Sequence, residues 1–191
     1  MPLSAVKPEQ YDALLAAKTE RVKSLLGDLI PAQTNVFPSH PTAYRMRAEF
    51  RIWHEGEQLD YVMFRPEDRK KPVAIEHFPV ACETIQTLMP ALREILQANS
   101  VLRHKLFQAE FLSTLAGESV ITLIYHRKLD ADWQQQAETL RTQLQTLCPG
   151  LSLIGRSRKQ KRVLGTDWVT ERLTIHGREY QYQQYEQAFT Q

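Results

Sequence analysis

The fold of this chain is decided by one stretch of strict alternation, Tyr44-Arg45-Met46-Arg47-Ala48-Glu49-Phe50-Arg51-Ile52. Apolar and charged side chains take turns along it, which is typical of a β-strand, where successive side chains point to opposite faces. One face is expected to lie on a core, and the other to carry three arginines and a glutamate. This is the clearest strand pattern in the chain.

The segments around this strand predict a helix, a turn and two more strands. Residues 8–26 have the apolar spacing of an amphipathic helix with one face on a core. Residues 31–43 contain three prolines and are expected to form an extended connection. A turn at 54–57 would send the chain back along a second strand over 59–65, and a short third strand is expected at 73–76.

Two further helices are expected later in the chain. One is predicted over 83–97, where Pro90 should kink or divide it. The other is predicted over 131–147, capped by Asp130 or Asp132. Its core-facing stripe would be Trp133, Ala137, Leu140, Leu144 and Leu147.

The remaining segments predict strands joined by tight turns, which are antiparallel neighbours. Their expected positions are 105–115, 119–128, 151–157, 160–165, 172–176 and 179–183. The fold class is therefore α+β, with an antiparallel or mixed sheet, helices packed mainly on one face, and hairpin-then-helix units as its building blocks.

Composition and motifs exclude several classes of protein. The 191 residues are 42% hydrophobic and 24% charged, as in globular domains. The two distant cysteines, Cys82 and Cys148, argue for buried structural thiols and a reducing cytoplasm rather than a disulfide framework. No apolar run is long enough for a membrane span, and no signal peptide is evident.

Motifs of catalytic and metal sites are missing. The seven glycines form no phosphate loop. No His-Glu-x-x-His, paired Cys-x-x-Cys or Gly-x-Ser-x-Gly motif occurs, so no metal site and no autonomous enzyme is expected.

Basic residues are clustered although the formal net charge is only +2. Five of the seven residues in 156–162 are basic, and further basic residues gather in 45–51 and 103–105. Such clusters indicate a local polyanion site. The alternative is that they are solvated strand faces without a ligand.

The arginines of the opening strand suit a nucleic acid. Alternate residues of a strand stand about 6.6 Å apart on one face, so three guanidiniums in a row can reach phosphates or base edges. Glu49 would orient an arginine or accept a hydrogen bond from a base. The alternative is an ion-pair ladder across strands on a solvated face.

Two aromatic rings, Phe107 and His126, lie among basic residues and could stack on splayed RNA bases. The alternation places Phe107 on the side of Ala109 and Phe111, which indicates core instead. A single histidine at a strand end is commonly a surface residue without a ligand.

Several stretches resemble the RNA uracil-5-methyltransferase family, specifically its bacterial tRNA branch. They are residues 44–54, 101–108, 123–130, 153–156 and 186–191, in order along the chain. The resemblance implies an enzyme that transfers a methyl group from S-adenosylmethionine to carbon 5 of the uridine at T-loop position 54 of tRNA. A cysteine nucleophile and a glutamate base would perform it.

The resemblance assigns no catalytic residue to this sequence, because the family's glycine-rich loop and Ser-Cys-Asn-Pro segment are absent from it. The chain alone is therefore expected to be inactive. Gln191 matches the glutamine at the entrance to the methyl-donor site. Residues 1–40 would form an N-terminal helix and extended connection, 41–185 an RNA-binding α+β domain, and 186–191 the start of a linker to the missing methyl-donor domain.

The resemblance also bears on binding residues. The strand with Arg47, Glu49 and Arg51 would face tRNA, and a twist or bulge would be needed to turn Phe107 outward. The expected RNA-binding residues are Arg45, Arg47, Glu49, Arg51, Lys105, Phe107, His126, Arg156 and Phe189. The expected partners are the tRNA T arm and the protein's own C-terminal methyltransferase domain, with no membrane and no metal. The alternative is a non-catalytic RNA-binding or protein-interaction domain whose basic face packs on a missing partner.

Overall fold

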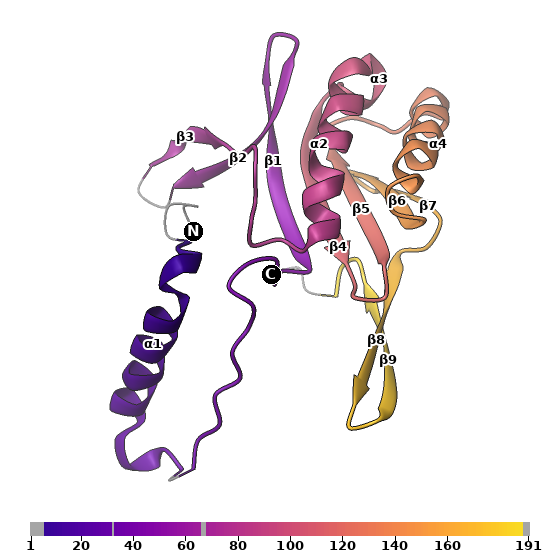
Figure 1. The fold of residues 1–191 in the computed structure, drawn as a ribbon. Helices are drawn as coiled ribbons and strands as arrows, with labels where there is room; N and C mark the ends of the chain where they lie inside the picture. Colours follow the sequence, from indigo (N-terminus) through magenta and orange to yellow (C-terminus); the bar gives the residue numbers. More distant parts are fainter. Residues whose placement is uncertain (1–5, 32, 66–67, 189–191) are drawn as a thin grey trace.

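A seven-stranded sheet forms the body of the protein in a computed structural model that describes residues 6–31, 33–65 and 68–188 (Figure 1). Its order is β3-β2-β1-β4-β5-β6-β7, and all neighbours are antiparallel except β5 and β6. The strands are β1 (Arg47–Glu55), β2 (Gln58–Arg65), β3 (Asp68–Ala74), β4 (Leu106–Ser113), β5 (Glu118–Tyr125), β6 (Gly150–Ser157) and β7 (Gln160–Leu164). The expected α+β class with a mixed sheet is confirmed.

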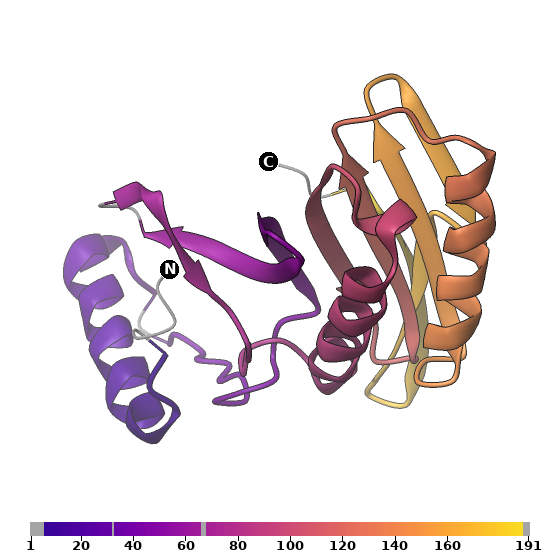
Figure 2. The same ribbon diagram turned by 90° about the horizontal axis from the view of Figure 1, so that it is seen from above.

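Helices cover one face of this sheet, as predicted (Figure 2). They are α2 (Glu83–Ala98), the short α3 (Ser100–Arg103) and α4 (Ala131–Gln145). Pro90 does not divide α2, because its apolar stripe packs into the core on both sides of the proline. The cap of α4 is Asp130, whose Oδ1 accepts a hydrogen bond from the Trp133 amide at 2.9 Å. Because α4 connects β5 to β6, those two strands run parallel.

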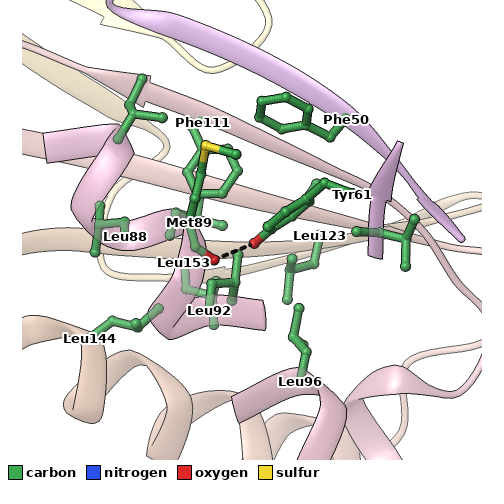
Figure 3. Close-up of a cluster of buried hydrophobic side chains, with 14 of the residues drawn as sticks. Phe50, Tyr61, Leu88, Met89, Leu92, Leu96, Phe111, Leu123, Leu144 and Leu153 are labelled. Atoms are coloured by element: carbon green, nitrogen blue, oxygen red, sulfur yellow. Dashed lines mark hydrogen bonds between the residues drawn. The ribbon is translucent and has the colours of Figure 1, made fainter. Parts of the chain in front are cut away.

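The core lies between the sheet and the helices (Figure 3). Phe50 and Phe111 project from the strands toward the leucines of α2, and Tyr61 donates a hydrogen bond to the Met89 carbonyl at 2.9 Å. Burial raises the pKa of the Tyr61 hydroxyl, so it remains a neutral donor. Gly155 lies under the Trp133 ring, where a Cβ would collide with it, so β6 and α4 approach closely.

The helix α1 (Tyr11–Leu26) lies between two short 3-10 turns, η2 (Pro8–Gln10) and η3 (Gly27–Leu29), and stands apart from the sheet (Figures 1 and 2). None of its residues is buried, and Leu25 is 74% exposed. The expected core contact is therefore wrong, because amphipathic spacing shows that a face is apolar but not what covers it. Leu147, expected in the core, is also exposed because α4 ends before it.

A separate hairpin covers one end of the other sheet face. Its strands, β8 (Trp168–Ile175) and β9 (Arg178–Tyr185), pair only with each other within the described residues. At its base Val169 is buried against three residues of the large sheet: Leu112, Val120 and Ile154. Glu171 accepts a hydrogen bond from the Leu115 amide at 3.0 Å. We call the sheet face opposite α2 and α4 the open face, because this hairpin covers only part of it.

Candidate nucleic-acid interface

A row of side chains crosses the open face away from the hairpin. In the strand registers Arg51 lies opposite Gln108, Gln108 opposite Ile124, and Ile124 beside Arg156. Ala48, Phe50 and Ile52, which alternate with the charged residues of β1, are buried on the helix side. The alternation therefore predicted the orientation of β1 correctly.

A β-bulge in β4 brings Phe107 onto the open face. Leu106 pairs with Tyr125 and Gln108 with Ile124, which leaves Phe107 as an extra residue between two consecutive pairs. A bulge of this kind changes which side the following residues face. The expectation that Phe107 shares the core with Phe111 is therefore wrong, and the bulge is the reason.

Three side chains of the open face form a stack. The Phe107 and His126 rings lie 4.1 Å apart between centroids with an interplanar angle of 27°, and the Arg51 guanidinium carbon lies 3.8 Å from the Phe107 centroid. Both Arg51 and His126 are exposed. The His126 amide donates to the Lys105 carbonyl at 3.0 Å, which fixes the ring-bearing residue to the start of β4. We call Arg51, Phe107 and His126 the stack cluster.

Arg47, at the other end of β1, is occupied by the protein itself. Its guanidinium lies 3.1 Å from Glu49 and 3.6 Å from Glu110, and it donates to the Glu186 carbonyl at 3.2 Å. Glu110 is only 7% exposed. Burial and the nearby Glu49 raise the pKa of Glu110, and the charge of Arg47 opposes that rise. At this end of the open face, the ion pairs of Arg47 with Glu49 and Glu110 match the alternative of an ion-pair ladder that the sequence left open.

Arg156 is likewise held within the molecule. Its guanidinium lies 3.1 Å from one oxygen of Glu186, and the other oxygen lies 3.2 Å from the Lys161 ammonium. Lys161 also lies 2.7 Å from Asp167. Burial disfavours the charge on Lys161, but hydrogen bonds to Asp167 and Glu186 outweigh it and raise its pKa. Glu186, only 3% exposed, thus anchors the segment after β9 to the sheet.

The remaining expected site residues are dispersed. Arg45 precedes β1 and forms an isolated parallel bridge with Ala81. Lys105 is exposed just before β4, at the edge of the stack cluster. Phe189 and Gln191 lie outside the described residues. The structure therefore brings Arg51, Phe107 and His126 together, with Lys105 beside them, and Arg156 lines a hollow that His126 shares.

Sequence reasoning missed Lys128, which lines a basic hollow beside His126 together with Arg158 and Lys159. The sequence did contain a signal, since these basic residues lie within a few positions of the ends of β5 and β6. The parallel pairing that brings the two strand ends together was not predicted.

Neither a run of glycines at the start of a helix nor a cluster of metal ligands occurs among the described residues. Four of their glycines, Gly56, Gly117, Gly165 and Gly177, stand singly with positive φ outside helices and strands, and none opens a helix as a phosphate loop does. Within this part of the chain no group of three His, Cys, Asp or Glu residues could hold a metal ion. Both cysteines are buried and free. No helix of the described segments is long and apolar enough to cross a membrane.

Comparison with known proteins identifies relatives over the whole chain. A tRNA/tmRNA (uracil-C(5))-methyltransferase of Chromohalobacter salexigens is 53% identical across 100% of this chain and 51% of its own length. Its counterpart in Aromatoleum aromaticum is 50% identical across 100% of this chain and 50% of its own length. The chain thus spans about half the length of these curated relatives.

The fold also matches a solved structure. The Pyrococcus abyssi tRNA (uracil-54, C5)-methyltransferase, crystallised with S-adenosyl-L-homocysteine, superposes with a TM-score of 0.63 at 17% identity, over 95% of this chain and 44% of that one. A family model described as tRNA (Uracil-5-)-methyltransferase matches residues 10–191. This chain therefore belongs to the tRNA (uracil-5-)-methyltransferase family.

Proposed function

We propose that this chain is the N-terminal, tRNA-binding portion of an enzyme that forms 5-methyluridine at T-loop position 54 of tRNA. The observation that supports this most is the stack cluster, where an arginine and two aromatic rings gather on an exposed part of the sheet. The relatives' names, which specify tRNA and tmRNA uracil, agree with an RNA ligand.

The stack cluster suits a loop base that has left its own stack. A base to be methylated must be extruded from a folded loop, which exposes the π faces of its neighbours. His126 offers an exposed ring against such a face, since its contact with Phe107 leaves it accessible. Stacking of this kind contributes roughly 1–3 kcal/mol per base. Arg51 has no carboxylate partner in the described residues. Its guanidinium can therefore donate hydrogen bonds to a phosphate or to the edge of a base.

We propose that methyl transfer takes place in the part of the relatives' length that this chain does not cover. We infer that S-adenosylmethionine binds there, with Gln191 at the entrance, and that this chain alone transfers no methyl group. Residues 41–185 would form the RNA-binding domain, with 1–40 as helix and connection and 186–191 as linker. The two buried free thiols agree with a reducing cytoplasm.

A protein-interaction role suits a different surface. The exposed leucines of α1, including Leu25 and Leu26, are the kind of apolar surface that partners cover. The stack cluster is polar and aromatic instead, and its residues belong to β1, to β4 and to the end of β5, not to α1. RNA binding is therefore the better proposal for the stack cluster.

The test is equilibrium binding of the chain to a fluorescent T-arm hairpin at fixed salt, measured by anisotropy. The control RNA has the same stem closed by a loop without extruded bases. We expect preference for the T arm, and loss of that preference in His126→Ala and Phe107→Ala. Equal affinity for both hairpins would leave only generic electrostatic attraction and would contradict the proposal.

A further inference from the structure

A basic hollow lies beside the stack cluster, where β5 and β6 end. It has a volume of about 750 Å³, and no acidic side chain lines it. The basic residues around it are His126, Arg127, Lys128, Arg156, Arg158 and Lys159. His126 therefore belongs to both the hollow and the stack cluster.

The parallel pairing of β5 and β6 creates this hollow. Ile124 lies beside Arg156, so both strands end at the same edge of the sheet, and residues of the segments that follow them line the hollow. The two loops are tied together by Gln160, whose side-chain oxygen accepts hydrogen bonds from the Leu129 amide and the Ser157 hydroxyl, both at 3.0 Å. These hydrogen bonds fix the two segments relative to one another at the hollow.

Apart from His126, the basic residues of the hollow fall into two kinds. Arg127 donates to the His104 and Val101 carbonyls at 3.0 and 2.7 Å, and Arg156 is paired with Glu186. These two arginines support the walls. The other three, Lys128, Arg158 and Lys159, are exposed and have no ion pair among the described residues. Three uncompensated positive charges around one hollow favour an anion with several oxygens.

We propose that this hollow binds one backbone phosphate of the RNA, adjacent to the base on the stack cluster, through Lys128, Arg158 and Lys159. The proposal rests on the proposed RNA-binding function. A nucleotide joins an aromatic base to a phosphate, and His126 lies in the same way in both a stacking surface and a basic hollow. The two contacts together would fix the register of one nucleotide, because phosphate contacts position an RNA while base contacts select it.

The salt dependence of binding tests this assignment. A triple variant, Lys128→Gln, Arg158→Gln and Lys159→Gln, should bind the T-arm hairpin with a slope of log K against log salt about one unit shallower than that of the unsubstituted chain. The matched control removes three charges from α1 by Lys18→Gln, Arg21→Gln and Lys23→Gln, and should leave the slope unchanged. An unchanged slope in the hollow variant, or an equal change in the control, overturns the proposal.

A second measurement locates the phosphate. Hairpins that each carry one neutral methylphosphonate linkage are compared, and one linkage in the T loop should weaken binding to the unsubstituted chain but not to the triple variant. Equal losses at every linkage would overturn the assignment. Unchanged T-arm affinity in Phe107→Ala and His126→Ala would contradict the stacking role alone. No T-arm binding by the unsubstituted chain would contradict both the proposed RNA-binding function and the phosphate contact.

Discussion

The two ends of β1 each carry an arginine on the open face, but the two arginines have different surroundings. Arg47 is enclosed by carboxylates and a carbonyl, whereas Arg51 is exposed over the Phe107 ring. The difference comes from the groups within reach, because Arg47 lies opposite Leu112 and reaches Glu110 diagonally across to β4, whereas Arg51 lies opposite the uncharged Gln108. An arginine of β1 is thus occupied or exposed according to the carboxylates within its reach, not according to its own place in the alternating pattern.

The largest expected effect comes from Arg47→Ala. This substitution leaves the buried Glu110 without its nearest cation, so we expect the free energy of unfolding to fall by about 2–3 kcal/mol. Affinity for the T-arm hairpin, measured on the folded fraction, should stay within about twofold. Urea unfolding and anisotropy measure the two quantities. An unaltered stability together with a large loss of affinity would show that Arg47 contacts RNA.

The matched substitution at the other end, Arg51→Ala, should have the opposite profile. We expect T-arm binding to weaken by about 1–2 kcal/mol, because a charged contact to RNA is lost. Stability should change by less than about 0.5 kcal/mol, since Arg51 is exposed. The same two assays apply, and a stability loss as large as that of Arg47→Ala would remove the distinction between the two ends.

The substitution Gln108→Glu should make the Arg51 end resemble the Arg47 end. A carboxylate opposite Arg51 would hold its guanidinium and repel phosphate, so T-arm affinity should fall by about 1 kcal/mol at low salt, and less at high salt. Gln108→Met is the control without a charge. If both variants bind alike at every salt concentration, the cross-strand neighbour does not govern Arg51.

The smallest effect concerns pH. Burial, and then repulsion from Glu49, raise the pKa of Glu110 above its ordinary 4.5, so the folded protein keeps this proton at a pH where the unfolded chain has lost it. Stability should therefore fall as pH rises from about 4.5 through the raised pKa. Glu110→Gln should flatten that fall in urea unfolding at a series of pH values, and parallel curves for both proteins would contradict it.

The regular parts of this fold could be predicted from local patterns. Alternation in β1 placed Ala48, Phe50 and Ile52 in the core, and capping chemistry identified Asp130 as one of two candidates for the start of α4. These features depend on a few consecutive residues, which a pattern of period two or 3.6 describes.

The candidate site was less predictable, because its geometry depends on pairs distant in sequence. The position of Phe107 depends on a bulge against β5, which no count along β4 can detect. The partners of Arg47 and Arg156 include Glu186, which lies at the far end of the chain from β1. The exposed face of α1 shows the same limit, since an apolar stripe does not specify what covers it.

The boundary between β1 and β4 has a consequence for the order in which this protein folds. Strands on either side of that boundary pair with near neighbours in sequence, whereas β1 and β4 meet only after the long segment containing α2 has closed. Arg51 and Phe107 face each other across this boundary. We therefore expect this pairing to be the slowest in the sheet, and a ligand bound across the stack cluster would stabilise the contact between β1 and β4.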